Sequence, residues 1–163
     1  MNTSNVLRLY ERLPQTFESN TCGFLITLFS FSVLVCPGNK QLYANTSSKT
    51  IQSFNFPFSY LSNIQCTWRI TAPANFVVKI KFRVINLEYC SSACSCDFVE
   101  VFDYNNTAAE CLGKRCRGNP KYVSTGRSMI VNFRSNFFVA GQGFEASYWT
   151  VKGERKGKNK DVT

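Results

Sequence analysis

The chain has 163 residues, of which 15% are aromatic and 18% are charged, so its composition excludes a chain that is disordered throughout and suits one domain with appended segments. Its formal net charge is +9, and it has no histidine, which excludes Ser-His-Asp and Cys-His catalysis. Six of its eight cysteines lie between Cys66 and Cys116, a density typical of a disulfide framework in an oxidising compartment. We therefore expect an exported protein that is not an enzyme.

The first predicted element is a secretory signal within an N-terminal region, residues 1–35. Residues 23–35 form an apolar, charge-free run of 13, which matches the core of a signal peptide and is too short for a transmembrane helix. Cleavage before Val33 would leave Cys36 on the mature chain and remove Cys22. We expect a secreted protein without a transmembrane span; the alternative interpretation of the run is a buried core helix.

Short segments of alternating apolar and polar residues follow a polar, turn-rich stretch, residues 37–50. In the strongest of them, 76–87, aliphatic and aromatic residues alternate with Lys and Arg, as in a strand with one buried and one solvated face. Turn signals rich in Gly, Asn and Pro separate the segments, which indicates an all-β sandwich or barrel. Three further strands are predicted, within 66–71, 129–134 and 144–148.

Two other features of the chain depend on export. Asn-x-Ser/Thr triplets begin at Asn45 and Asn105, and both would accept glycans in a secreted protein. The apolar alternation ends before residues 151–163, a basic segment of low hydrophobicity that predicts a disordered tail.

Several short motifs stand in order along residues 36–148. They begin with Cys-Pro-Gly at Cys36 and Cys-Thr-Trp at Cys66, and they end with Gly-Phe-Glu-Ala-Ser-Tyr at 143–148. Between them, residues 89–103 read Tyr-Cys-Ser-Ser-Ala-Cys-Ser-Cys-Asp-Phe-Val-Glu-Val-Phe-Asp. The set resembles a CUB domain. The resemblance implies a disulfide-stapled jelly-roll β-sandwich of two antiparallel sheets over residues 36–150, and a non-catalytic module that binds an extracellular protein partner.

The resemblance also implies two disulfides, Cys36–Cys66 and Cys94–Cys116, while the other cysteines depart from the family pattern. We expect a third bridge between Cys96 and Cys111. Once Cys22 leaves with the signal, an odd number of cysteines remains, and Cys90 is the candidate for the unpaired one. The alternative is a zinc site, although the spacing is not that of paired zinc knuckles; its ligands would be Cys90, Cys94, Cys96, Cys111 and Cys116.

Calcium is the cofactor that the resemblance implies. Related domains hold the ion with acidic residues at positions that correspond here to Glu88, Asp97 and Asn136. Two carboxylates brought together repel each other, and a hard cation with oxygen ligands relieves that repulsion. Asn136 keeps a carbonyl oxygen but lacks the charge, and Phe138 stands where related sites offer a hydroxyl, so we expect weak calcium binding or none. Ordinary solvated carboxylates are the alternative.

Basic residues form a second candidate site. Lys and Arg alternate along the predicted strand 76–87, and a further basic cluster follows it in the sequence. Several cations on one surface attract a polyanion, so the alternative function is binding of heparin or another sulfated glycan. No nucleic-acid-binding motif accompanies the charge, so nucleic acid is not an expected partner. The residues of the further cluster are Lys114, Arg115, Arg117, Lys121 and Arg127.

An acid and base pair for hydrolysis is the remaining chemistry that the residues could supply. A sandwich this small has no evident cleft in which two carboxylates could flank a substrate, so catalysis is not expected. The acidic residues considered are Glu88, Asp97, Glu100 and Asp103.

Overall fold

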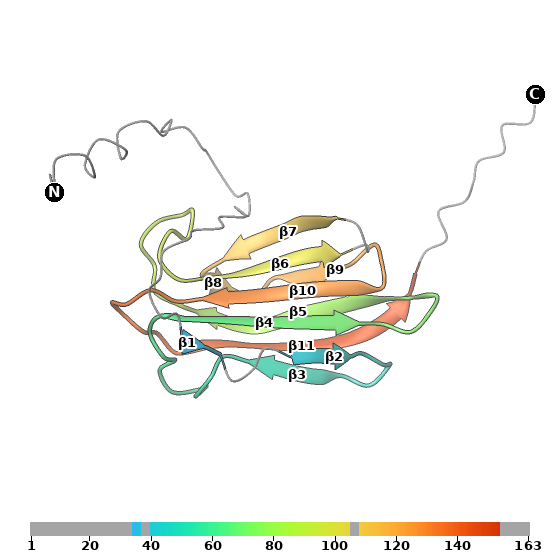
Figure 1. Ribbon diagram of the computed structural model, residues 1–163, viewed down its shortest axis with the longest axis horizontal. Coiled ribbons are helices and arrows are strands. Elements are labelled where there is room, and N and C mark those ends of the chain that lie inside the picture. The colour runs from blue at the N-terminus through green and yellow to red at the C-terminus, as the bar shows by residue number, and fades with distance from the viewer. Residues whose placement is uncertain (1–33, 37–39, 105–107, 154–163) are drawn as a thin grey trace, which may run out of the picture.

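The computed structural model describes residues 34–36, 40–104 and 108–153, and within them the chain forms eleven strands and no helix (Figure 1). The predicted signal core, 23–35, lies outside these residues as far as residue 33, but its last two residues, Leu34 and Val35, form the first strand. The sequon at Asn105 and the part of the predicted tail, 151–163, that follows residue 153 also lie outside them.

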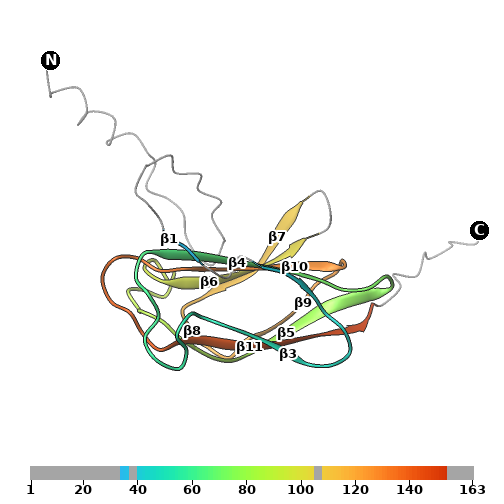
Figure 2. The same ribbon diagram turned by 60° about the horizontal axis from the view of Figure 1, so that its bottom comes forward.

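Two sheets stack face to face as a sandwich (Figure 2). The six-stranded sheet has, in order, β1 (Leu34–Val35), β4 (Ile64–Thr71), β10 (Ser128–Arg134), β6 (Phe98–Tyr104) and β7 (Ala109–Arg115), with β2 (Lys40–Tyr43) beside β4. The five-stranded sheet has, in order, β3 (Lys49–Gln52), β11 (Gly143–Lys152), β5 (Phe76–Asn86) and β8 (Arg117–Gly118), with β9 (Lys121–Val123) beside β5. The pairings are antiparallel except that β1 and β2 run parallel to β4.

An aromatic core joins the two sheets. The ring of Phe144 on β11 lies 5.5 Å from Trp68, 5.6 Å from Phe133 and 5.8 Å from Phe82, measured between centroids. These four residues come from β11, β4, β10 and β5, the central strands of both sheets. Buried aromatic side chains contribute large apolar areas, so this cluster holds the sheets together.

The alternation of apolar and polar residues predicted the central strands well. The prediction for 76–87 corresponds to β5, whose inward residues Val78, Ile80 and Phe82 are fully buried. β11 continues past residue 150, where the domain was expected to end, because Val151 pairs with Val77 and Lys152 with Phe76. The short edge strands β2 and β3 lie within or beside the stretch that was interpreted only as turns.

Three loops meet at one end of the sandwich, on the left of Figure 1, and we call this the loop end. The loops connect β3 to β4, β5 to β6 and β10 to β11, and they comprise residues 53–63, 87–97 and 135–142. They meet because β3, β5 and β10 end, and β4, β6 and β11 begin, at the same end of the two sheets.

Candidate functional site at the loop end

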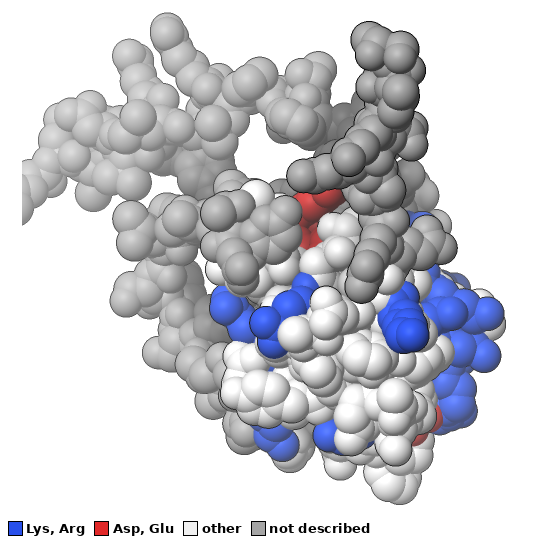
Figure 3. Space-filling view, turned by 90° about the vertical axis from the view of Figure 1, so that its right-hand side faces the viewer, with Lys and Arg blue, Asp and Glu red and all other residues white. Residues whose placement is uncertain are grey.

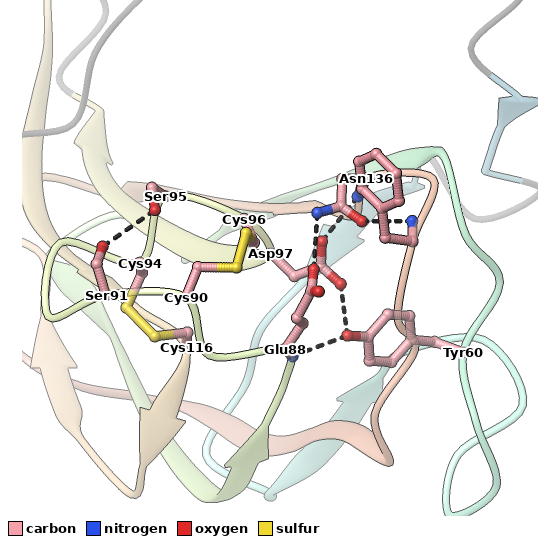
Figure 4. Close-up of a disulfide and its surroundings, with 11 residues drawn as sticks. Tyr60, Glu88, Cys90, Ser91, Cys94, Ser95, Cys96, Asp97, Cys116 and Asn136 are labelled. Atoms are coloured by element: carbon pink, nitrogen blue, oxygen red, sulfur yellow. Dashed lines mark hydrogen bonds between the residues drawn. A yellow bond between two sulfur atoms is a disulfide. The ribbon is translucent and has the colours of Figure 1, made fainter.

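Three disulfides connect residues within the part of the chain that the structure describes. Cys36–Cys66 joins the first strand segment to β4, and Cys94–Cys116 joins the β5–β6 loop to the end of β7, as the resemblance implies. The third, Cys90–Cys96, closes a short loop with a Cα–Cα distance of 5.8 Å. Two of the three bridges therefore hold the loop that carries Glu88 and Asp97 (Figure 4).

The expected bridge between Cys96 and Cys111 is wrong, and so is the expectation that Cys90 stays unpaired. In the strand pairing, Cys111 on β7 lies opposite Phe102 on β6. Phe102 is six residues after Cys96 in an extended part of the chain. Six extended residues span about 20 Å, whereas the Cα atoms of a disulfide are about 4.4 to 6.8 Å apart. Cys111 is itself disulfide-bonded.

The zinc alternative fails because its cysteine ligands form disulfides. Potential ligand atoms of Glu88, Cys90 and Cys96 lie within 4.8 Å of one another, but the two sulfurs are bonded to each other. Zinc needs thiolates, and all five cysteines of the proposed ligand set are in disulfides. The cluster therefore offers zinc a single carboxylate.

The structure brings together Glu88, Asp97 and Asn136, the three residues expected to hold calcium. The Asn136 side chain donates to Glu88 Oε2 over 2.7 Å, and its backbone N–H donates to Asp97 Oδ1, also over 2.7 Å. Tyr60, which sequence reasoning missed, donates its hydroxyl to Asp97 Oδ2 over 2.5 Å and accepts the Glu88 N–H over 3.1 Å. This loop-end cluster links all three loops by hydrogen bonds (Figure 4).

Burial perturbs the acid–base properties of this cluster. Asp97 has no exposed surface, and desolvation raises the pKa of its carboxyl, while the hydrogen bond from Tyr60 opposes the rise. Desolvation, followed by the bond to Asp97, raises the pKa of Tyr60 to about 12. The tyrosine therefore stays protonated and available as a donor.

The cluster as it is arranged does not fit a calcium ion. Glu88 and Asp97 have suitable oxygens, but Asn136 turns its NH₂ group toward Glu88, and its Oδ1 accepts the backbone N–H of Phe138 over 2.8 Å. Turning the amide over would set its NH₂ group against that N–H. A positively polarised NH₂ group therefore lies beside the Glu88 carboxylate.

Exposed apolar side chains lie in all three loops that the cluster joins. Phe138, two residues beyond Asn136, is 82% exposed, and Phe58 in the β3–β4 loop is 73% exposed. Exposed apolar residues gathered in this way mark an interaction surface. The exposed large apolar residues of the three loops are Phe54, Phe58, Leu61, Tyr89, Phe137, Phe138 and Val139.

A hollow of about 270 Å³ opens beside these residues. It lies between the start of β4, the Cys90–Cys96 bridge and the β10–β11 loop, and its lining includes Arg134, Asn136 and Phe137. The exposed side chain of Arg134 gives the hollow a positive charge, and Phe137 gives it an aromatic surface.

The expected basic cluster is spread over the fold. Arg117 and Lys121 lie in the five-stranded sheet, whereas Lys114 faces Glu100 on the six-stranded sheet with its ammonium 3.9 Å from the Phe98 ring centroid. Arg115 ends β7 near Tyr122, and Arg127 donates to Ala72 O at the opposite end from the loops. These five residues therefore do not form one patch.

The other candidate residues are also apart from the loop end. Asp103 accepts hydrogen bonds from Thr125, which ties the β9–β10 turn at the far end of the sandwich. Glu100 lies on β6, so the four acidic residues considered for hydrolysis do not converge. Asn45 is exposed in the loop that connects β2 of the six-stranded sheet to β3 of the five-stranded sheet, and its Oδ1 accepts the Ser47 N–H over 3.0 Å.

Comparison with known proteins identifies the family. The sequence model of the CUB domain family matches residues 36–148, so the chain belongs to this family. It is 34% identical to the dorsal-ventral patterning protein tolloid of Drosophila melanogaster over 116 residues, and 36% identical to the embryonic protein UVS.2 of Xenopus laevis over 145 residues. These matches cover 70% and 82% of this chain but only 10% and 28% of the relatives.

A solved structure has the same fold. The MASP-1 CUB2 domain bound to Ca²⁺ superimposes with a TM-score of 0.58 at 22% identity, and the match covers 70% of this chain and 99% of that domain. CUB domains are non-catalytic modules of extracellular proteins that mediate protein interactions. In the described part of this chain, no helix has the length and apolar character needed to cross a membrane.

Proposed function

We propose that this chain is a secreted recognition module that binds a protein partner through the loop end. The observation that supports the proposal is the apolar surface of the three loops, of which Phe138 and Phe58 are the most exposed members. Aromatic residues are enriched among the residues that dominate binding energy in protein interfaces, and exposed apolar groups concentrated in one region are typical of an interaction site.

The loop-end cluster supports this function by holding the loops in place before a partner arrives. Asn136 contacts both Glu88 and Asp97, so the tip with Phe137 and Phe138 is tied to the β5–β6 loop. Tyr60 ties the β3–β4 loop to the same carboxylate. Binding surfaces that are ordered in advance lose less conformational entropy on association, which favours affinity.

The test compares binding of partners from extracellular fluid by the wild type and by Phe137→Ser/Phe138→Ser. We expect the variant to lose at least about tenfold in affinity while its melting temperature is unchanged, since both rings are exposed. Tyr43→Ser, which removes an aromatic ring that is 69% exposed on β2, is the control and should bind as the wild type does. Equal losses in both variants would contradict the proposal.

We also propose that the Asn136 amide holds the cluster without calcium, and that calcium binding at Glu88, Asp97 and Asn136 is weak or lost. The MASP-1 CUB2 domain is bound to Ca²⁺, so calcium is the second candidate means of ordering these loops. The hydrogen bonds of the amide to Glu88 and from Phe138 favour the first.

Thermal unfolding with excess calcium and with chelator distinguishes the two. We expect little or no shift for the wild type, whereas Asn136→Asp should gain a third carboxylate and about 1.4 kcal/mol at ten times its dissociation constant, which is about 4 to 8 °C. Asn86→Asp adds the same charge at an exposed position outside the cluster and should show no shift. A calcium-dependent shift in the wild type as large as that in Asn136→Asp would contradict the amide proposal.

A further inference from the structure

The outer face of the five-stranded sheet is strongly basic. On β5, Lys79, Lys81 and Arg83 alternate with buried residues that point into the core, so their side chains lie on the outer face. Lys121 on β9 pairs with Lys81, and Arg117 on β8 pairs with Asn86, which extends the same face toward the loop end. Glu145 is the one acidic residue in the five strands of this sheet.

A row of polar residues crosses this face. In the strand pairing, Thr50 lies opposite Ser147, Ser147 opposite Lys81, and Lys81 opposite Lys121. The row therefore sets two hydroxyl groups beside two ammonium groups on the four strands β3, β11, β5 and β9. Neighbouring strands are about 4.8 Å apart, so the four groups follow one another at nearly even intervals.

The paired lysines stand out from the other cations of the face. Arg83 forms an ion pair with Glu145, and Lys79 lies over the Trp149 ring, 5.8 Å from its centroid. Among the described residues, neither Lys81 nor Lys121 forms an ion pair or a side-chain hydrogen bond. Like charges directly opposite each other on neighbouring strands are destabilising, and an anion bound between them would relieve that repulsion.

The concentration of charge is visible from the end opposite the loops. Figure 3 shows Lys and Arg side chains gathered along its right-hand margin, the side of the five-stranded sheet, whereas the surface in the centre of the view is mostly uncharged. The basic face therefore lies along a broad side of the sandwich.

We infer that this face binds a sulfated glycan, with sulfate groups held between Lys81 and Lys121 and beside the hydroxyls of Ser147 and Thr50. An extended polyanion fits a flat sheet on which cations recur along one strand, and repeated sulfates add contacts along Lys79, Lys81 and Arg83.

Two other anionic partners fit less well. Single-stranded nucleic acid is held by stacking on open aromatic rings, but Trp149 is only partly exposed and lies beneath Lys79. A membrane surface takes apolar anchors beside the cations, and the exposed phenylalanines lie in the loops instead. Extracellular glycans also match the compartment of CUB domains.

The test measures binding of heparin by the full chain at a series of salt concentrations. Lys81→Gln/Lys121→Gln should weaken binding at least about tenfold and make the salt dependence shallower by about one to two ion equivalents. The control Lys40→Gln/Arg69→Gln removes the same charge from the six-stranded sheet and should change the affinity less than about threefold. Both variants should melt close to the wild type, since all four side chains are exposed.

Equal losses in the two double variants would overturn the inference, because net charge alone would then explain binding. It would also be overturned if phosphatidylserine vesicles or single-stranded DNA, but not heparin, bound in a manner that depends on Lys81 and Lys121. Phe137→Ser/Phe138→Ser should bind heparin as the wild type does, so a failure of the protein-binding proposal leaves this test intact.

Discussion

Gly143 occupies the first position of β11, where the chain passes close to Ser53. Its φ of +105° is rarely adopted by residues with a side chain, and a Cβ atom there would overlap Ser53 Oγ. That hydroxyl accepts the Phe144 N–H over 3.1 Å, so the overlap would disturb the start of the central strand.

We therefore expect Gly143→Ala to lower the free energy of unfolding by at least about 2 kcal/mol, measured by urea denaturation. Gly118 is the matched control, since it has the same φ of +105° but no atom within 4 Å of the position that a Cβ would occupy. Gly118→Ala should lower the free energy of unfolding by less, because only backbone strain opposes the substitution there. Equal costs would show that contact with Ser53 is unimportant.

Tyr60 stabilises the fold by donating a hydrogen bond to the ionised carboxylate of Asp97. The free-energy cost of removing the Tyr60 hydroxyl should therefore depend on pH. Tyr60→Phe removes the hydrogen bond that opposes the rise in the pKa of Asp97, and that pKa should rise further. A carboxyl with a raised pKa favours the folded state at low pH, and this contribution is lost as pH rises through the folded-state pKa. The destabilisation by Tyr60→Phe should therefore be largest near neutral pH, about 1 to 3 kcal/mol, and decrease on acidification.

Urea denaturation at several pH values measures this effect. Tyr148→Phe is the control, because Tyr148 is buried and desolvation alone raises the pKa of its hydroxyl. Its cost should not change in the acid range in which Asp97 titrates. A destabilisation by Tyr60→Phe that is the same at all pH values would argue against coupling to Asp97.

At the scale of elements, the two bridges that hold the β5–β6 loop should differ in their contribution to the free energy of unfolding. Cys90–Cys96 has a sequence separation of 6 and Cys94–Cys116 one of 22, and in the chain-entropy treatment they contribute about 2.4 and about 3.4 kcal/mol. Cys90→Ala/Cys96→Ala should therefore destabilise the protein less than Cys94→Ala/Cys116→Ala, measured by urea denaturation. The reverse order would indicate that packing of the β5–β6 loop outweighs loop closure.

The placement of elements also separates the two proposed surfaces. The three loops that carry the apolar residues lie at one end, whereas the basic row crosses the middle of the five-stranded sheet. A module of this kind could contact a protein partner and a glycan at once. Variants in one surface should then leave binding at the other unchanged.

For the whole molecule, we predict secretion with glycosylation at Asn45. Asn45 is exposed in the loop between β2 and β3, so the transferase can reach it in the secretory pathway. After expression in eukaryotic cells, removal of N-glycans should increase the mobility of the secreted protein, and Asn45→Gln should abolish part of that shift. N-terminal sequencing should find a start that retains Cys36; a start beyond it, or retention in the cytosol, would contradict the prediction.

The amino-acid sequence by itself determined the all-β class, the central strands, two disulfides and the grouping of Glu88, Asp97 and Asn136. The alternation of apolar and polar residues indicates which face of a strand is buried. The family pattern predicts two cysteine pairings because the family shares one fold. Only the tertiary structure decided that Cys90 pairs with Cys96, because strand register separates Cys111 from that loop.

The tertiary structure likewise decided the direction of the Asn136 amide and the composition of the basic face. Tyr60 is 37 positions from Asp97, and Lys81 and Lys121 meet across β5 and β9. A sequence pattern describes neighbours along the chain, whereas hydrogen bonds and charge repulsion depend on distances that strand pairing and loop packing set. The function of these surfaces therefore depends on contacts between residues that are remote in sequence.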